Sequence, residues 1–210
     1  MDSRRYGGSM IGQIRRRMTM GGSTKPYDAE VEYLESTGTQ WIDTGIAYNI
    51  DNIFSFDVDS EFTTSDTHEH LCTIGANRRI VFVGKYLTEY YIYSNGFSFR
   101  DTIVPLSTHH IIVINIPQSQ YIINGIKYET SYYYTDCNGM SLPLFARRYG
   151  YAPVNPCHAK VRHFAIYKDG INVRDLIPVR KNGIGYMYDK VSGQLFGNQG
   201  TGQFIIGPDK

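Results

Sequence analysis

The stretch VRKNGIGYMYDKVSGQLFGNQGTG, residues 179–202, decides between two classes of fold, because it places six glycines in twenty-four residues. Glycine at this density can form a loop whose backbone holds a phosphate, or it can let the chain turn tightly with no ligand. A dinucleotide fingerprint beginning at Gly183 needs glycine at position 188, where the chain has Tyr188, and no Gly-Lys-Ser/Thr of a P-loop is present. The stretch also shows no helical pattern whose N-terminus would face the anion, so nucleotide binding is not indicated.

Turn and strand signals in this stretch instead predict a β-hairpin. Residues 186–188 alternate tyrosine and methionine, residues 189–193 predict a turn, and residues 195–196 predict the returning strand. Gly193 lies where such a turn favours positive φ, and residues 197–202 predict a second turn into the last strand, QFII. The glycines therefore indicate the closing hairpin of a β-sandwich and argue against a catalytic loop.

Strand patterns follow one another from residue 27 onward. HHIIVINI, residues 109–116, is rich in β-branched side chains and predicts a central strand. IFSFDVDSEF, residues 53–62, alternates, with Phe54, Phe56, Val58 and Phe62 on one face and Ser55, Asp57, Asp59 and Glu61 on the other. Turns between strands are predicted at Asn95-Gly96, Asn124-Gly125 and Asp169-Gly170. Many short strands without helical periodicity predict an all-β, two-sheet antiparallel sandwich.

The composition is that of one soluble globular domain, predicted over residues 27–210. Hydrophobic residues make up 41% and charged residues 20%, and 18 tyrosines against a single tryptophan favour sheet. Three cysteines are an odd number without CxxC spacing, which argues against a disulfide framework and a structural zinc site. No apolar run reaches the length of a membrane span, and no secretory signal is evident.

Residues 1–26 predict a basic arm that is flexible when free. The segment has six Lys or Arg residues and one acid, a net charge of +5, whereas the rest of the chain has 15 basic and 19 acidic residues, a net charge of −4. It has too little apolar surface to order itself alone, so it is either a plain flexible terminus or an anchor that orders against a partner. The anchoring residues would be Arg4, Arg5, Arg15, Arg16 and Arg17. Three consecutive arginines are a small footprint for nucleic acid, which makes that partner unlikely.

Two segments carry a resemblance to a known family. VEYLESTGTQWIDTGI, residues 31–46, and AKVRHFAIYKDGINVRDLIPVRKNGIGYMYDKVSGQLFGNQGTGQFIIGPD, residues 159–209, resemble the opening and closing signatures of concanavalin-A-like, laminin-G-like jelly-roll domains. The variety they resemble is common in gut bacteria and their tailed phages, and YIING at residues 121–125 lies where such domains place an Asn-Gly hairpin. The resemblance covers residues 28–209 and implies a two-sheet antiparallel jelly-roll sandwich with an extended N-terminal arm.

The resemblance implies one fold but several possible functions, because such domains include lectins, glycosidases and structural modules. A short chain with a brief arm resembles a non-enzymatic virion structural or attachment protein: a head fibre, a capsid-decoration protein or a tail-associated protein. The alternative is a carbohydrate-binding module for host-surface or mucosal glycans, and a second alternative is a glycoside hydrolase. The implied partners are other virion proteins, further copies of the chain with a trimer favoured, and a host-surface glycan, with no membrane. The expected location is the virion, assembled in the bacterial host cytoplasm.

Candidate catalytic groups are few. Asp57, Asp59 and Glu61 come nearest to the ExDxxE pattern of related jelly-roll glycosidases and share one strand face, but their order differs and the last spacing is one residue short. Trp41, the residue suited to stack a sugar, lies sixteen residues upstream of Asp57, and no G-x-S-x-G elbow is present. We expect a solvated strand face and no catalytic residues.

Candidate metal ligands occur in two places. DTHEH, residues 66–70, offers His68, Glu69 and His70, but a catalytic zinc needs a third ligand that the sequence does not identify, so a polar loop is expected. The resemblance also allows calcium at a sandwich rim, with Asp43, Asp136 and Asn138 in predicted loops as candidate ligands. No cofactor is expected, and calcium is the one alternative.

The segment ARRYGYAPVNPCH, residues 146–158, is the best candidate for an exposed contact loop, because it combines two prolines with adjacent arginines. Tyrosine and arginine are enriched where proteins meet partners. The candidate glycan or partner surface comprises Trp41, Arg147, Arg148, Tyr149 and Tyr151.

Overall fold

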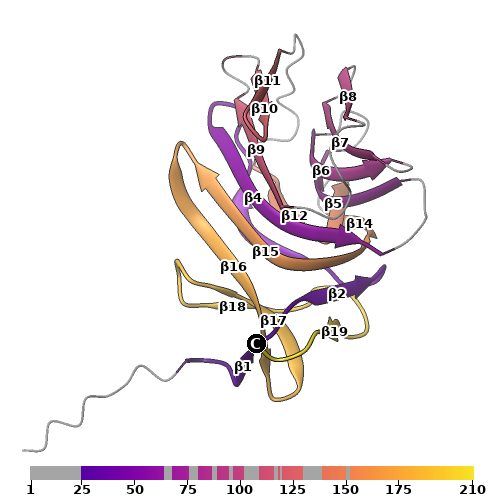
Figure 1. The fold of residues 1–210 in the computed structure, drawn as a ribbon, viewed down its shortest axis with the longest axis vertical. Helices are drawn as coiled ribbons and strands as arrows, with labels where there is room; N and C mark the ends of the chain where they lie inside the picture. Colours follow the sequence, from indigo (N-terminus) through magenta and orange to yellow (C-terminus); the bar gives the residue numbers. More distant parts are fainter. Residues whose placement is uncertain are drawn as a thin grey trace, which may run out of the picture.

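The computed structural model describes residues 25–63, 68–75, 80–86, 89–94, 97–101, 109–115, 118, 120–129, 139–149 and 152–210. Within these ranges the regular elements are β-strands and no α-helix occurs (Figure 1). The chain is therefore all-β with antiparallel sheets, as the alternation and turn signals predicted, and the arrangement is consistent with a β-sandwich.

One long sheet contains most of the described strands, with β4 and β15 side by side near its middle (Figure 1). Its main path runs through β11 (Ile126–Glu129), β10 (Gln120–Ile123), β9 (His109–Asn115), β4 (Ile53–Phe62), β15 (His158–Lys168), β16 (Ile171–Lys181), β17 (Ile184–Asp189) and β18 (Leu195–Phe196). Short strands attach to this path: β1 (Ala29–Glu30) to β16, β2 (Leu34–Thr37) to β15, and β19 (Ile205–Ile206) to β2. The predicted central position of β9 is confirmed, because β9 lies between β4 and β10.

A second sheet and a two-stranded pair complete the described fold. The second sheet runs through β14 (Ala152–Pro156), β13 (Ala146–Tyr149), β5 (His68–Ile74), β6 (Ile80–Tyr86), β7 (Glu89–Ser94) and β8 (Phe97–Asp101). The pair consists of β12 (Ser141–Leu144) and β3 (Ile42–Ala47). Among the described strands, pairing is antiparallel except between β13 and β5, which are parallel. That single parallel contact departs from the purely antiparallel sandwich that the sequence predicted.

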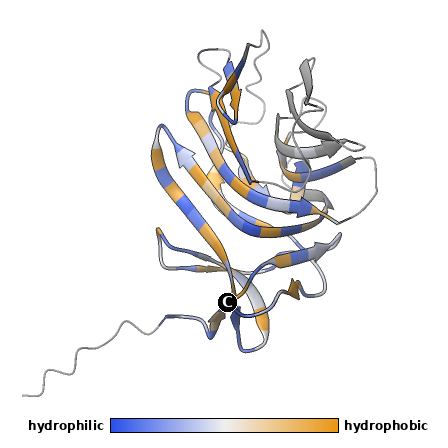
Figure 2. Cartoon of the chain, in the orientation of Figure 1, coloured by the Kyte–Doolittle hydropathy of each residue, from blue (hydrophilic) through white to orange (hydrophobic). Residues whose placement is uncertain are grey.

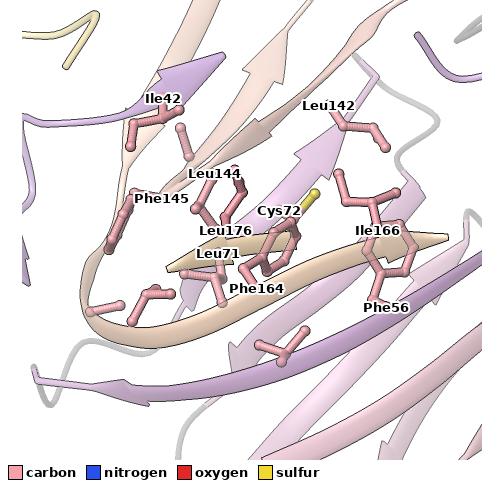
Figure 3. Close-up of a cluster of buried hydrophobic side chains, with 14 of the residues drawn as sticks. Ile42, Phe56, Leu71, Cys72, Leu142, Leu144, Phe145, Phe164, Ile166 and Leu176 are labelled. Carbon is pink, nitrogen blue, oxygen red and sulfur yellow. The ribbon is translucent and has the colours of Figure 1, made fainter. Parts of the chain in front are cut away.

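Apolar side chains from the two sheets and from β3 and β12 meet in one core (Figure 3). The strand β4 alternates in hydropathy along its length (Figure 2), and Phe54, Phe56 and Val58 are fully buried as predicted. Around them the core contains Ile42, Leu71, Cys72, Leu142, Leu144, Phe164, Ile166 and Leu176. Because successive side chains of a strand point to opposite faces, burial of one set leaves the other set on the far side of the sheet. That far side is called the outer face below.

Two of the predicted turns are present, and their central residues have the positive φ that such turns require. Asn124 and Gly125 have φ of 48° and 85°, and Asp169 and Gly170 have φ of 51° and 80°. Positive φ at both central residues matches the twist of a two-residue hairpin, and Asn, Asp and Gly adopt it at least cost. Residues 95–96 lie outside the described residues, although β7 and β8 pair antiparallel on either side of them.

The closing hairpin is confirmed and is organised by one buried carboxylate. β17 and β18 pair antiparallel, and Gly193 in the turn between them has φ of 72°. Asp189 is fully buried and accepts hydrogen bonds from the backbone N–H groups of Asp175, Val191 and Ser192. It also accepts one from the Ser192 hydroxyl at 2.6 Å and lies 3.4 Å from Nη1 of Arg174. A buried carboxylate with this many donors fixes the turn in one shape.

The second glycine turn packs against the opening segment of the sequence. Thr201 N–H donates to the Thr39 carbonyl, and Gln199 N–H donates to the Trp41 carbonyl at 2.8 Å. At Gly200 a Cβ atom would lie 2.0 Å from the Thr39 carbonyl oxygen, so only glycine allows this approach. The opening and closing signatures, far apart in sequence, therefore form one contact.

Candidate functional site on the outer face of the long sheet

The outer face brings polar side chains of β4, β9 and β15 together. Because Phe54, Phe56 and Val58 point into the core, the intervening polar residues of β4 point outward, and these are Ser55, Asp57, Asp59 and Glu61. On β15 the register with β4 shifts between Val161 and His163, which inserts one extra residue. This bulge lets the consecutive residues Arg162 and His163 both reach the carboxylates of β4.

Imidazoles and carboxylates alternate in a row across four strands. Nε2 of His109 hydrogen-bonds Oδ1 of Asp57, and Nδ1 of His163 lies 3.6 Å from the same oxygen. The other ring nitrogen of His163 lies 2.8 Å from Oδ1 of Asp175, whose Oδ2 lies 3.5 Å from the Lys190 ammonium. This ionic row, from His109 to Lys190, fixes the orientation of the Asp57 carboxylate.

Arg162 engages the two remaining carboxylates of β4. Its guanidinium lies 2.8 Å from Glu61 and 3.6 Å from Asp59. The hydrogen bond with Glu61 raises the pKa of Arg162 above its ordinary value, against the opposing effect of partial burial. Asp59 and Glu61 are therefore both held in ion pairs with one permanent cation.

A shallow depression of about 260 Å³ lies beside the ionic row. It is lined by Ser55, Phe56, Asp57, Ile111, Val113, Tyr167 and Gly170. Strand register builds it, since Ser55 is opposite both Val113 and Tyr167, and Asp57 is opposite Ile111. Cross-strand partners share a face of the sheet, so the side chains of Ser55, Asp57, Ile111, Val113 and Tyr167 form one continuous surface, whereas the side chain of Phe56 points into the core.

Three residues that line the depression have a polar side-chain atom without a hydrogen-bond partner among the described residues. These atoms are Oγ of Ser55, Oδ2 of Asp57 and the hydroxyl of Tyr167. Ile111, which is 49% exposed, and the half-buried Val113 add apolar surface next to them. A ligand with an apolar face and several hydroxyl groups fits this combination, because its ring can contact Tyr167 while its hydroxyls donate to Asp57.

Two residues of the candidate surface, Trp41 and Arg148, meet at a buried position instead of an open one. Trp41 is only 8% exposed, and the Arg148 guanidinium lies 5.6 Å from its ring centre. Arg148 also binds Oδ2 of Asp43 at 2.8 Å, and Asp43 accepts hydrogen bonds from the Ser141 hydroxyl and the Gly45 N–H. Trp41 thus presents little surface to a ligand, and the cluster ties β3, β12 and β13 together.

The contacts in this cluster lower the pKa of the Asp43 carboxyl group. Partial burial disfavours its charged form, but the hydrogen bonds from Ser141 and Gly45 and the charge of Arg148 outweigh that effect. The pKa of Asp43 is therefore lower than its ordinary value. The carboxylate is ionised and already bound within the chain.

The other predicted surface residues are placed only in part. The contact loop predicted over residues 146–158 is wrong, because residues 146–149 form β13 and residues 152–156 form β14. Arg147 is half-buried on β13, and Tyr149 is the last residue of that strand. Tyr151 lies outside the described residues, as do the arm residues Arg4, Arg5, Arg15, Arg16 and Arg17. Within the arm, Lys25 contacts Glu30 at 2.7 Å. The roles proposed for these residues stay predictions.

Residues 68–70 begin the strand β5, with Glu69 and His70 buried, so the polar loop predicted for them is wrong. The candidate metal ligands form no metal site among the described residues. The Glu69 carboxylate accepts from the N–H of His158 and contacts its Nδ1, each at 3.2 Å, while Nδ1 of His70 lies 3.3 Å from the Thr73 hydroxyl. In the described part of the chain, no three His, Cys, Asp or Glu side chains are grouped so that they could hold a metal ion. The side chain of His68 and the whole of Asp136 and Asn138 lie outside that part, so the calcium alternative stays a prediction.

The two described cysteines belong to the buried core. Cys72 and Cys157 are both free and buried, and burial raises the pKa of each thiol well above its ordinary value. The charge of Glu69 raises the pKa of Cys157 further. Neither thiol is activated as a nucleophile, and Cys137 lies outside the described residues.

Sequence reasoning missed the residues that build the depression. The pattern of β4 identified Ser55 and Asp57 as outward-facing, but Tyr167, Ile111 and Val113 had no signal of their own. Alternation along β15 and β9 could have placed them on the outer face. Only the register between the strands brings them opposite Ser55 and Asp57.

Searches against models of protein families and against curated proteins found no match to this chain. In the described residues, no helix has the length and apolar character required to cross a membrane.

Proposed function

We propose that this chain is a non-enzymatic structural and attachment protein of a virus particle, and that its sandwich binds a saccharide in the depression of the outer face. One observation carries the proposal: Ser55, Asp57 and Tyr167, each with a polar side-chain atom that has no partner among the described residues, line the depression together with apolar residues. A pyranose offers apolar C–H faces and hydroxyl donors together, so it complements both kinds of surface at once.

The ion pairs of the outer face support binding without hydrolysis. A glycosidase needs two carboxyl groups directed at the scissile bond, one as proton donor and one as nucleophile or base. Here Asp59 and Glu61 share the guanidinium of Arg162, and Asp57 is held by His109. Of these three residues only Asp57 lines the depression, and its Oδ2 has no partner among the described residues.

The virion assignment and the finer jelly-roll topology are supported by the family resemblance of the opening and closing segments. Those segments contact each other through residues 39–41 and 198–201, so the resemblance concerns one packed unit. In this proposal the basic arm anchors the sandwich to other virion proteins as a head fibre, capsid-decoration or tail-associated protein. Further copies of the chain assemble with it, a trimer being favoured.

Saccharide binding by the full-length chain tests the proposal. We expect the purified protein to bind at least one glycan on an array of host-surface and mucosal structures. Tyr167→Ala should weaken that binding by about tenfold or more, because it removes the aromatic surface and one hydroxyl of the depression.

Tyr27→Ala is the matched control, since Tyr27 packs edge-on against Tyr188 with ring centres 5.0 Å apart and does not line the depression. Its binding should equal that of the wild type. Absence of any glycan binding at high protein concentration, or equal losses in the two variants, would contradict the proposed site.

Anchoring is tested separately by deleting residues 1–26 and measuring incorporation into assembled particles. We expect the truncated chain to be left out of particles while the full chain is incorporated. Normal incorporation of the truncated chain would contradict an anchoring role for the arm.

A further inference from the structure

We propose that the depression on the outer face is specific for neutral saccharides and rejects glycans that carry a carboxylate or sulfate group. This inference rests on the proposed saccharide binding and names the chemical class of the ligand. It depends on the charges that line and surround the depression.

The depression itself holds one ionic group, and that group is negative. Its lining residues are neutral apart from Asp57, whose side chain is 28% exposed. A carboxylate attracts hydroxyl donors strongly, because hydrogen bonds to an ionised acceptor are stronger than those between neutral groups. A second anion placed beside it is repelled, and partial exclusion of water strengthens that repulsion.

Nearby cations are already engaged with carboxylates of the sheet. Arg162 pairs with Asp59 and Glu61, and Lys190 lies 3.5 Å from Asp175. An anionic ligand would have to break one of these pairs to gain a positive partner. Doing so would leave a carboxylate uncompensated, so these cations offer no net attraction to an anion.

Two further lysines lie in the wider neighbourhood but not in the depression. Lys168 follows Tyr167 in sequence, but its partner across the sheet is Phe54, which faces the core. Lys127 is on β11, two strands beyond β9, which is about 10 Å at ordinary strand spacing. Neither lines the depression.

The geometry of Asp57 favours hydroxyl groups. His109 occupies Oδ1, and His163 approaches the same atom, so the carboxylate is held with Oδ2 as its open acceptor. An ionised carboxylate accepts hydrogen bonds and cannot donate them, which selects ligands that present O–H donors. A site built this way penalises a ligand that offers only acceptors at the same position.

The experiment compares pairs of glycans that share one neutral core and differ by a terminal sialic acid. With full-length protein, we expect the neutral member to bind about tenfold or more tightly, and added salt to narrow the difference by screening. Asp57→Asn should weaken binding of the neutral glycan and reduce the difference to about threefold or less, because it removes the repelling charge.

Asp209→Asn is the control, since it also removes one carboxylate charge but at an exposed position that pairs with Arg180, and neither residue lines the depression. It should keep the full preference for the neutral glycan. Ile111→Lys provides a second variant that keeps Asp57; at a lining position 49% exposed, it should raise affinity for the sialylated glycan about tenfold.

The outcomes separate the two proposals. Equal or tighter binding of the sialylated member by the wild-type protein would overturn neutral specificity while leaving saccharide binding in place. An unchanged preference in both Asp57→Asn and Ile111→Lys would overturn the electrostatic origin. If no glycan of either class binds, the proposed function itself fails.

Discussion

Two carboxylates of the same sheet, Asp189 and Asp57, show how the closing hairpin differs from the outer face. Asp189 is 0% exposed and receives donors on both oxygens, from the backbone, from a hydroxyl and from a guanidinium. Asp57 is 28% exposed, and one of its oxygens has no partner among the described residues. Both oxygens of Asp189 are bonded inside the chain, whereas Asp57 keeps one oxygen that can accept a hydrogen bond from a ligand.

The difference assigns a role to each region. A buried polar group must be satisfied inside the chain, so a fully bonded carboxylate specifies one local structure. An accessible group with an open acceptor is solvated when the site is empty, and it can exchange water for a ligand. The closing hairpin therefore uses its carboxylate to fix the local structure, whereas the depression keeps the acceptor on which the proposed binding depends.

The largest expected effect is that of Asp189→Ala on stability. The substitution leaves three backbone N–H groups and the Arg174 guanidinium without their buried acceptor, which costs about 3–5 kcal/mol in the free energy of unfolding. Urea denaturation measures the change. Asp209→Ala is the control, because Asp209 pairs with Arg180 at an exposed position and should matter much less. Similar losses of unfolding free energy in the two variants would contradict the difference between a buried, fully bonded carboxylate and an exposed one.

Gly200→Ala is expected to have the next largest effect. The added Cβ would lie 2.0 Å from the Thr39 carbonyl oxygen, so the backbone must move, and we expect a loss of about 2–3 kcal/mol. Gly183→Ala is the comparison, since φ is 76° there but no atom lies within 4 Å of the new Cβ. It should cost about 1 kcal/mol from the left-handed conformation alone. Thermal or urea unfolding of both variants would show whether contact between the two signatures matters more than turn conformation.

The sequence predicted the parts of the fold that depend on neighbouring residues. The alternation of residues 53–62, the turns at residues 124–125 and 169–170 and the closing hairpin are all local patterns, and each is present. The parallel pairing of β5 with β13 was missed, because pairing between distant strands has no local signature. The backbone conformation of Phe145, which has φ of 66° in the core, could not be predicted either, because positive φ is not expected of a large aromatic residue.

The candidate site was harder to predict for the same reason. Trp41 was chosen as a surface residue by its chemistry, but it is only 8% exposed, and its ring contacts Arg148, which lies more than a hundred positions later in the chain. Tyr167 is one of 18 tyrosines, and nothing local distinguishes it from those that pack in the sheet. Its position opposite Ser55 follows from the register between β4 and β15, which only the folded chain defines.

Asp43 is partly exposed like Asp57 but has partners on both oxygens like Asp189, and its replacement gives the smallest expected effect on stability. Its side chain is 35% exposed, yet Ser141, Gly45 and Arg148 all bind it. Asp43→Asn should lower the free energy of unfolding at pH 7 by about 1 kcal/mol, since one ion pair is lost at a partly exposed position. Asp51→Asn, at an exposed carboxylate with no ion pair among the described residues, is the control and should change nothing.

The effect of Asp43 should depend on pH in one direction. The pKa of Asp43 is lower in the folded chain than its ordinary value, so the folded state binds fewer protons than the unfolded state in this range. The stabilisation is therefore complete above the ordinary value, near pH 4, and is lost as pH falls through the folded value. The difference between wild type and Asp43→Asn should then shrink in urea titrations from pH 7 to pH 3. A difference that stayed constant over this range would mean that the Asp43 cluster acts through packing, like the core, and not through its charge.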